Sequence, residues 1–111
     1  MGESFKDLLV WQRAIQMTLA IYRCTAEFPS SERFGLTNQL RRASVSVASN
    51  VAEGYGRSTR GEYVLFLGHA RGSTCEVETQ LVIARGFVSR AIIGELVEQP
   101  FAPLGFDLLE N

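Results

Sequence analysis

The chain has 111 residues, of which 46% are hydrophobic and 21% are charged, an ordinary globular composition that excludes wholesale disorder. The formal net charge of −1 argues against a simple basic nucleic-acid binder. No apolar run reaches the roughly 18 residues of a membrane span, and Glu3, Lys6 and Asp7 interrupt the apolar core that a signal peptide needs. We therefore expect one cytoplasmic domain, residues 1–111, with no membrane partner.

Charge is unevenly distributed along the chain. Residues 33–71 hold six arginines against two glutamates, a net +4, whereas residues 76–111 hold six acidic residues against two arginines, a net −4. Arginine suits phosphate and carboxylate partners, and it also suits ion pairs at interfaces. A high-GC coding sequence gives the same preference for arginine without any function. A functional use of the arginines and a coding bias therefore both stay open as explanations.

The first helix is expected over residues 7–27, with Asp7 at its N-terminal dipole end and Pro29 ending it. Two apolar sets recur at helical spacing. The first set is Leu8, Trp11, Ile15, Leu19 and Tyr22, and the second is Val10, Met17, Ile21, Cys24 and Phe28. A helix that is apolar on two sides lies centrally or meets another subunit. Cys24 and Cys75 are read as buried apolar residues, with a disulfide between helices as the alternative.

The second helix is expected over residues 34–55, with Ser30, Ser31 or Thr37 as possible caps. Its apolar stripe is Leu36, Leu40, Ala43, Val47, Val51 and Gly54. A polar line runs beside it: Arg42, Ser46, Asn50, Glu53 and Arg57. The remaining flank, formed by Ser44, Ala48 and Ala52, is small enough for another helix to approach closely.

The third helix is expected over residues 59–86 with Thr59 or Ser58 as its cap, and Thr59 with Glu62 forms a capping-box pattern. Its seam is Tyr63, Phe66, Leu67, Ala70, Ser73, Val77, Leu81, Ala84 and Val88. Gly68 and Gly72 cost roughly 1 kcal/mol each in helix propensity, so we expect a packing reason for them, such as contact with the second helix.

A short fourth helix over residues 89–99, capped by Ser89, is stopped by Pro100 and Pro103. With no strand pattern in the chain, the short loops predict an all-α, antiparallel up-down-up-down four-helix bundle with a short or irregular last helix.

Five arginines are the candidate nucleic-acid-binding residues, forming a strip along the second and third helices: Arg41, Arg42, Arg57, Arg60 and Arg71. Such a strip would neutralise phosphates without reading sequence. The alternative is that these arginines pair with glutamates at the surface or between subunits. Asn50, Glu53 and Arg57 likewise form either a helix-stabilising group or a polar network that joins the second helix to the third or to a partner chain.

No catalytic constellation is visible. His69 is the only histidine, and residue 66 is Phe, so the Glu-x-x-His pairs of di-metal bundles are missing. No nucleophile elbow accompanies the serines, and Gly54-Tyr55-Gly56 follows a helix, unlike a dinucleotide loop. We therefore expect no metal, no cofactor and no enzymatic activity.

Three stretches carry a family resemblance: FKDLLVWQRAIQMTLAIY, FPSSERFGLTNQLRRASVSVASNVAEGYGR and EYVLFLGHARGSTCEVETQLVIAR. Over about residues 5–88 they resemble the four-helix bundle family named after proteins encoded in intervening sequences of bacterial 23S rRNA genes. The motif residues include Asn50, Glu53, Gly54, Arg57, Ser73 and Glu76, for which the family supplies no catalytic duty.

The resemblance implies an antiparallel four-helix bundle that assembles into a ring, typically a pentamer, with a non-enzymatic role. A related branch, the accessory variability proteins of diversity-generating retroelements, is similar in fold and implicated in binding nucleic acid and a reverse transcriptase. The chain departs from the family at Pro100 and Pro103, where a long last helix is usual.

Two hypotheses follow. The first is an oligomeric scaffold whose arginines bind RNA or DNA phosphates. The second is a pure interaction protein whose arginines pair with the acidic 76–111 region of a neighbouring subunit.

Overall fold

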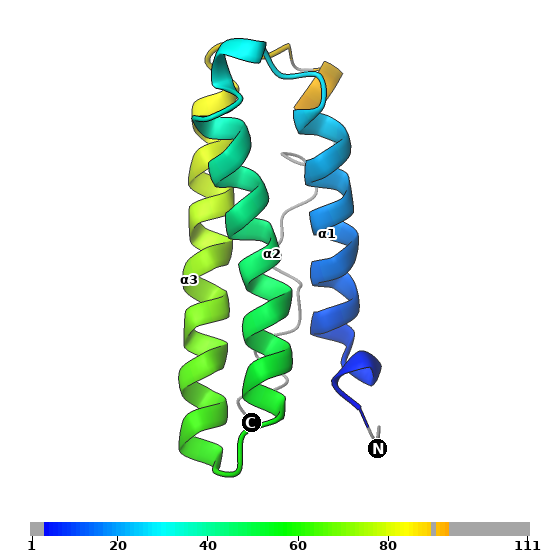
Figure 1. Cartoon of the computed structure of the whole chain (residues 1–111), viewed down its shortest axis with the longest axis vertical. Coiled ribbons are helices and arrows are strands. Elements are labelled where there is room, and N and C mark those ends of the chain that lie inside the picture. Colours follow the sequence, from blue (N-terminus) through cyan, green and yellow to red (C-terminus); the bar gives the residue numbers. More distant parts are fainter. Residues whose placement is uncertain (1–3, 90, 94–111) are drawn as a thin grey trace.

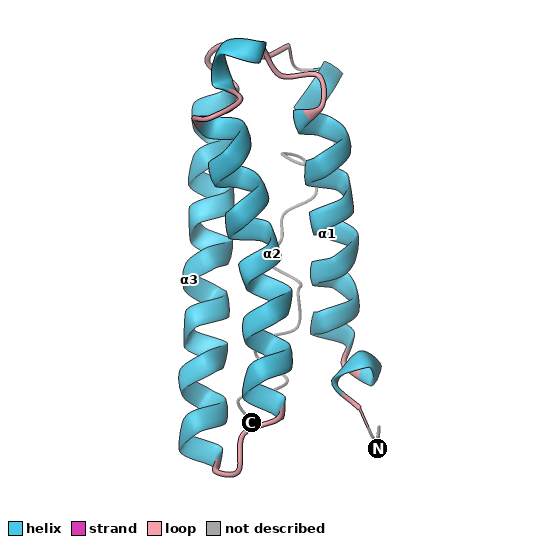
Figure 2. Cartoon of the chain, viewed as in Figure 1, coloured by secondary structure: helices cyan, strands magenta, loops and turns pink. Residues whose placement is uncertain are grey.

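The computed structural model describes residues 4–89 and 91–93. Figure 1 shows three long helices side by side, which are α1 (Leu9–Thr25), α2 (Leu36–Tyr55) and α3 (Arg60–Ala84). Two short 3-10 helices, η1 (Phe5–Asp7) and η2 (Ser30–Glu32), precede α1 and α2. Helix is the only regular structure among the described residues, as the colours of Figure 2 show, so the all-α prediction is confirmed for them.

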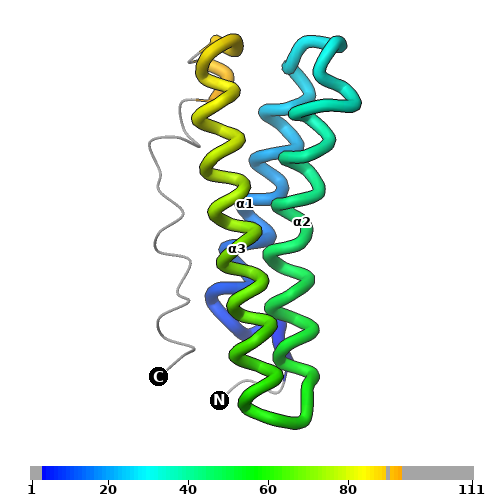
Figure 3. Tube along the Cα trace, turned by 90° about the vertical axis from the view of Figure 1, so that its left-hand side faces the viewer, coloured from blue at the N-terminus to red at the C-terminus, as the bar shows by residue number. Residues whose placement is uncertain are grey.

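The chain passes up α1, down α2 and up α3 in the view of Figure 1. Helix α2 contacts both α1 and α3, and Figure 3 shows α2 and α3 side by side along their whole length. Of the expected fourth helix, residues 91–93 are helical, and the hydroxyl of Ser89 accepts a hydrogen bond from the Ala91 amide at 3.1 Å. The rest of that segment, with Pro100 and Pro103, lies outside the described residues.

The helical stripes read from the sequence form the core. All six residues of the predicted stripe on α2 are buried, as are the seam residues of α3 from Leu67 to Val88, whereas Tyr63 and Phe66 at its start are partly exposed. On α1 the second apolar set is buried. The first set is half-buried, and it ends in Leu19 and Tyr22, which are 54% and 42% exposed. Helix α1 therefore turns one apolar side inward and leaves part of the other at the surface.

Two helix starts differ from the expected ones. Helix α1 begins at Leu9, because Asp7 belongs to η1 and Leu8 is extended, with ψ of 127°. Helix α2 begins at Leu36 after Gly35, and none of the expected serine and threonine caps is used. Instead the Glu32 carboxylate accepts the Leu36 amide at 3.1 Å. A side chain four residues upstream thus satisfies a free amide of the first turn.

The start of α3 is as predicted. The hydroxyl of Thr59 accepts the Glu62 amide at 3.1 Å and lies 3.0 Å from the Glu62 carboxylate. The helix ends at Ala84, two residues before the predicted end, where Arg85 and Gly86 continue as turns.

Close approach of α2 and α3 occurs at Gly54. A Cβ built on Gly54 would lie 2.8 Å from the Cβ of Phe66 and 3.3 Å from the Tyr63 carbonyl oxygen. The expected reason for the glycines of α3 is wrong, because a Cβ on Gly68 or Gly72 would meet nothing within 4 Å. Both face outward and do not contact α2.

Candidate nucleic-acid interface

Arg41 of α2 is hydrogen-bonded to α1. Its Nε donates to the hydroxyl of Thr25 at 2.8 Å, and its terminal nitrogen lies 3.4 Å from the Tyr22 carbonyl oxygen. The guanidinium also covers the Tyr22 ring, 4.6 Å from its centroid. These partners are all uncharged, so they fix the orientation of the guanidinium and leave its positive charge uncompensated.

Arg42, the next residue, is exposed. It makes no hydrogen bond or ion pair with the described residues. It lines two neighbouring grooves, one between α1 and α2 and the other between α2 and α3. Arg42 therefore carries the charge in this region that is most available to an anion from outside.

Arg57 is neutralised within the chain. Its guanidinium lies 2.8 Å from the Glu53 carboxylate, 3.9 Å from that of Glu62, and 4.6 Å from the centroid of the Phe66 ring. All three charged side chains are 40–54% exposed, so solvent weakens these pairs. Arg60, the first residue of α3, sits at the same end of the molecule.

Arg71 borders a different edge of α3. A helix turns by about 200° over two residues, so Arg71 lies across the helix from Ser73, which faces α2. The five predicted arginines thus occupy three places: the α1–α2 side, the α2–α3 turn, and the edge of α3 away from α2. The structure brings Arg41 and Arg42 together and separates Arg71 from them.

The predicted polar network divides into two parts. Asn50 donates to the carbonyl and hydroxyl oxygens of Ser46 at 2.8 and 2.9 Å, and Ser73 donates to the Ser46 hydroxyl at 2.9 Å. This chain joins α2 to α3. Glu53 and Arg57 form the separate ion pair near the turn, with Gly54 at the close approach beside it. Ser46 lies one turn before Asn50 on the predicted polar line. It accepts the hydrogen bonds of both Asn50 and Ser73 and so links them.

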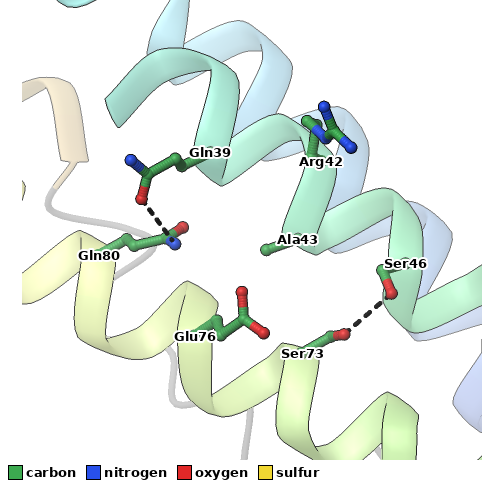
Figure 4. Close-up of a pocket in the computed structure, with 7 residues that line it drawn as sticks. All are labelled: Gln39, Arg42, Ala43, Ser46, Ser73, Glu76 and Gln80. Carbon is green, nitrogen blue, oxygen red and sulfur yellow. Dashed lines mark hydrogen bonds between the residues drawn. The ribbon is translucent and has the colours of Figure 1, made fainter. Parts of the chain in front are cut away.

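Glu76 lies in the α2–α3 groove, a polar hollow of about 320 Å³ (Figure 4). Its carboxylate points into the groove between Gln80 and Ser73, as Figure 4 shows, and makes no ion pair with the described residues. At one end the Gln80 amide lies 3.5 Å from that of Gln39, and the Oε1 of Gln80 is buried without a hydrogen-bond partner in the described structure. A groove with a carboxylate inside and Arg42 at its edge is mixed in charge.

The α1–α2 groove is larger, about 610 Å³, and differs in charge. Its lining contains two guanidiniums and no carboxylate. The residues are Tyr22, Asn38, Arg41, Arg42, Val45 and Ser46. An aromatic ring, an amide and two cations beside an open hollow suit a phosphate backbone with its sugars, because phosphate contacts come mostly from arginine and polar side chains.

Tyr22, Thr25, Asn38 and Val45 are the members of this site that sequence reasoning missed. The sequence pattern places Tyr22 in an apolar stripe, and Thr25 and Asn38 belong to no motif. The sequence does contain one signal: a tyrosine and a threonine three residues apart lie on one side of a helix, so they can together face a neighbouring chain element.

Two groups of the described chain have a raised pKa. Burial, with a smaller contribution from Glu27, raises the pKa of the Cys24 thiol from 9.0 to about 11, so this thiol stays protonated at neutral pH. Burial, and then Tyr55, raises the pKa of Tyr63. His69 stacks edge-on against Phe66 at 5.7 Å. Within residues 4–89 and 91–93 no three His, Cys, Asp or Glu side chains gather closely enough to hold a metal ion.

Both cysteines are free thiols. Cys24 is buried as predicted, whereas Cys75 is exposed, which corrects the expectation that both are buried. Among the described helices none has the length and apolarity that crossing a membrane requires.

Fold and site together define a small all-helical protein with grooves beside α2, one of which is lined by two arginines. The chain belongs to the 23S rRNA-intervening sequence protein family, whose model matches residues 6–98. This match confirms the resemblance seen in the sequence. Comparison with curated proteins found no match.

Proposed function

We propose that the chain is a non-enzymatic, self-associating helical scaffold of the cytoplasm that binds the phosphates of RNA or DNA in the α1–α2 groove. In this proposal residues 89–99 complete an antiparallel up-down-up-down bundle, and the bundles assemble into a ring, a pentamer by the family resemblance. The matched family supports the scaffold, and the charge of the groove supports the ligand.

The observation that carries the proposal is the uncompensated charge of Arg41 and Arg42. Both line the same groove, the lining contains no acidic side chain, and the partners of Arg41 are uncharged. A phosphate placed there would accept charge-assisted hydrogen bonds, which are about twice as strong as neutral ones. The fixed guanidinium of Arg41 loses little conformational freedom on binding, which favours affinity.

Self-association would multiply this weak site. One groove with two arginines neutralises few phosphates, and the overall charge of the chain is −1. Several copies held rigidly in one assembly would present their grooves at fixed spacing to one nucleic acid, and the effective concentration of each further groove would raise the overall affinity. The ring therefore explains how a nearly neutral chain could bind a polyanion.

The test is binding of a short structured RNA and of a duplex DNA, each labelled, measured by anisotropy at increasing salt. We expect binding at roughly 50 mM salt that weakens steeply as salt rises, because bound phosphates release counterions. Absence of binding to either ligand at that salt, with the protein assembled, would refute the nucleic-acid part of the proposal.

One observation favours a second function, a scaffold whose arginines serve its own assembly. Arg42 and Glu76 are both exposed, and neither forms an ion pair in the described chain. Arg42 of one copy could therefore pair with Glu76 of a neighbouring copy. Arg42→Glu would then dissociate the assembly in sedimentation, whereas a nucleic-acid site would lose only binding. Arg42 is the better residue to change, because replacing Arg41 would also break the contact between α1 and α2.

A further inference from the structure

The outward side of α3 carries no charge over its whole length. Nine exposed residues form this α3 outer face: Gly61, Val64, Leu65, Gly68, Gly72, Cys75, Thr79, Val82 and Ile83. At about 100° per residue they fall within a sector of about 100° on the side opposite the buried seam. Its four large side chains are 40–61% exposed. Surface helices normally carry charged residues on this side, so the α3 outer face is unusual.

The glycines of this face are not needed for close packing against the other described helices. A Cβ at Gly61, Gly68 or Gly72 would meet nothing within 4 Å, and each glycine lowers helix propensity. Gly68 and Gly72 lie between the aliphatic residues at either end and leave a flat middle where another helix axis could approach closely. The arrangement of large residues at the ends and small ones in the middle indicates the relief of a helix-packing surface.

We propose that the α3 outer face binds the α3 outer face of a second copy, with the two α3 helices antiparallel and related by a two-fold axis. Leu65 and Ile83 lie nine residues on either side of Thr74, and Val64 and Val82 lie nine on either side of Ser73. The members of each pair are separated by 18 residues, five whole turns, so they share one line along the helix. A two-fold axis at this midpoint therefore brings Leu65 against Ile83 of the second copy, and Val64 against Val82.

The charges along the two edges of the face select the antiparallel direction. Glu78 lies along one edge, and His69 and Glu76 lie along the other, seven residues apart about nearly the same midpoint as the aliphatic pairs. The antiparallel two-fold places the His69 ring beside Glu76 of the second copy and keeps Glu76 and Glu78 on opposite edges of the contact. A parallel two-fold would instead place Glu76 beside Glu78, and like charges so close oppose association.

This contact rests on the self-association in the proposed function and adds to it a two-fold surface that is separate from the contacts within a ring. A two-fold contact is isologous, so it joins two chains, or two rings, and stops there. One helix face per copy gives an interface at the small end of specific interfaces. The pairing should therefore depend on protein concentration in the micromolar range.

Cys75 is a natural reporter of the contact. With helix axes about 8 Å apart and each Cα about 2.3 Å from its axis, the two Cys75 Cα atoms would be about 6 Å apart, within disulfide range. Mild oxidation of the wild-type protein should convert most of it to a disulfide-linked pair on a non-reducing gel. The Cys75→Ser variant should give none, because Cys24 is buried.

Gly72→Leu tests the packing. The added side chain has open space within its own chain, so the helix content and melting temperature should not fall, while sedimentation should show at least a tenfold weaker pairing and cross-linking should be lost. Ser49→Leu, which places the same side chain on the exposed side of α2, should change neither.

Three results would overturn the inference. They are a wild-type chain that does not pair at roughly 100 micromolar, unchanged pairing in Gly72→Leu, and assembled protein in which Cys75 does not cross-link. In the last two cases self-association itself stands, and only its assignment to the α3 outer face fails. Binding of nucleic acid is measured separately and is not decided by these results.

Discussion

Gly54 of α2 lies against Phe66 of α3 so closely that a Cβ on the glycine would stand 2.8 Å from the Cβ of the phenylalanine. The Phe66 Cβ is fixed to its backbone, so it cannot swing aside. We predict that Gly54→Ala pushes the two helices apart and lowers the free energy of unfolding by about 1–3 kcal/mol. Urea denaturation followed by circular dichroism measures this loss.

Gly68→Ala is the matched control for that change. It makes the same substitution in the interior of a helix, at a position where a Cβ meets nothing within 4 Å. Measured at a protein concentration too low for the α3 outer faces to pair, alanine should therefore raise the free energy of unfolding by roughly 0.5–1 kcal/mol, through helix propensity alone. Equal effects of the two substitutions on the free energy of unfolding would contradict the close approach of α2 to α3 at Gly54.

The hydrogen bond from Ser73 to Ser46 is predicted to couple α2 and α3. Ser73→Ala should cost about 1 kcal/mol, since the Ser46 hydroxyl keeps its bond from Asn50. A double-mutant cycle with Ser46→Ala should show a coupling energy of about 0.5 kcal/mol or more between the two serines. Additive losses would mean that the two hydroxyls do not interact.

Thr59→Ala removes the cap of α3, whose hydroxyl accepts the Glu62 amide. The expected loss is about 1 kcal/mol of unfolding free energy. Thr59→Ser keeps the oxygen and should retain most of the stability. If serine and alanine are equally destabilising, the Thr59 hydroxyl does not stabilise α3 as a cap.

The pKa of about 11 at Cys24 predicts a pH dependence. Because burial raises this pKa above the unfolded value of 9.0, the neutral thiol contributes stability below about pH 9, and that contribution is lost as pH rises through 11. Iodoacetamide at about pH 8.5, near the pKa of a free thiol, should therefore alkylate exposed Cys75 and spare Cys24, as mass spectrometry would show. Rapid alkylation of Cys24 in the folded protein would contradict its burial.

The core could be predicted from the sequence because it depends on periodicity. The stripe from Leu36 to Gly54 and the seam from Leu67 to Val88 are buried as their spacing indicated. The start of α2 could not be predicted in this way, because a glutamate upstream of Gly35 replaces the expected cap. Local choices between such caps differ by little free energy, so residue types alone do not decide them.

Most partners of the arginines could not be predicted from the sequence. Glu53 and Arg57 could be paired in advance because they are four residues apart on one helix. Arg41 and Thr25 are 16 residues apart on different helices, and nothing in their types predicts that contact. The same holds for Gly72: spacing suggested a contact with α2, but the rotation of α3 in the bundle turns this residue outward.

The most direct test of the central claim is the salt dependence of RNA binding by Arg42→Glu, with Arg85→Glu as a control that makes the same charge change at the end of α3. We predict that Arg42→Glu binds at least tenfold more weakly, and that the slope of log affinity against log salt falls by about one or more. Arg85→Glu should stay close to wild type. Equal losses in both variants, or none in Arg42→Glu, would contradict the assignment of the α1–α2 groove as the phosphate site.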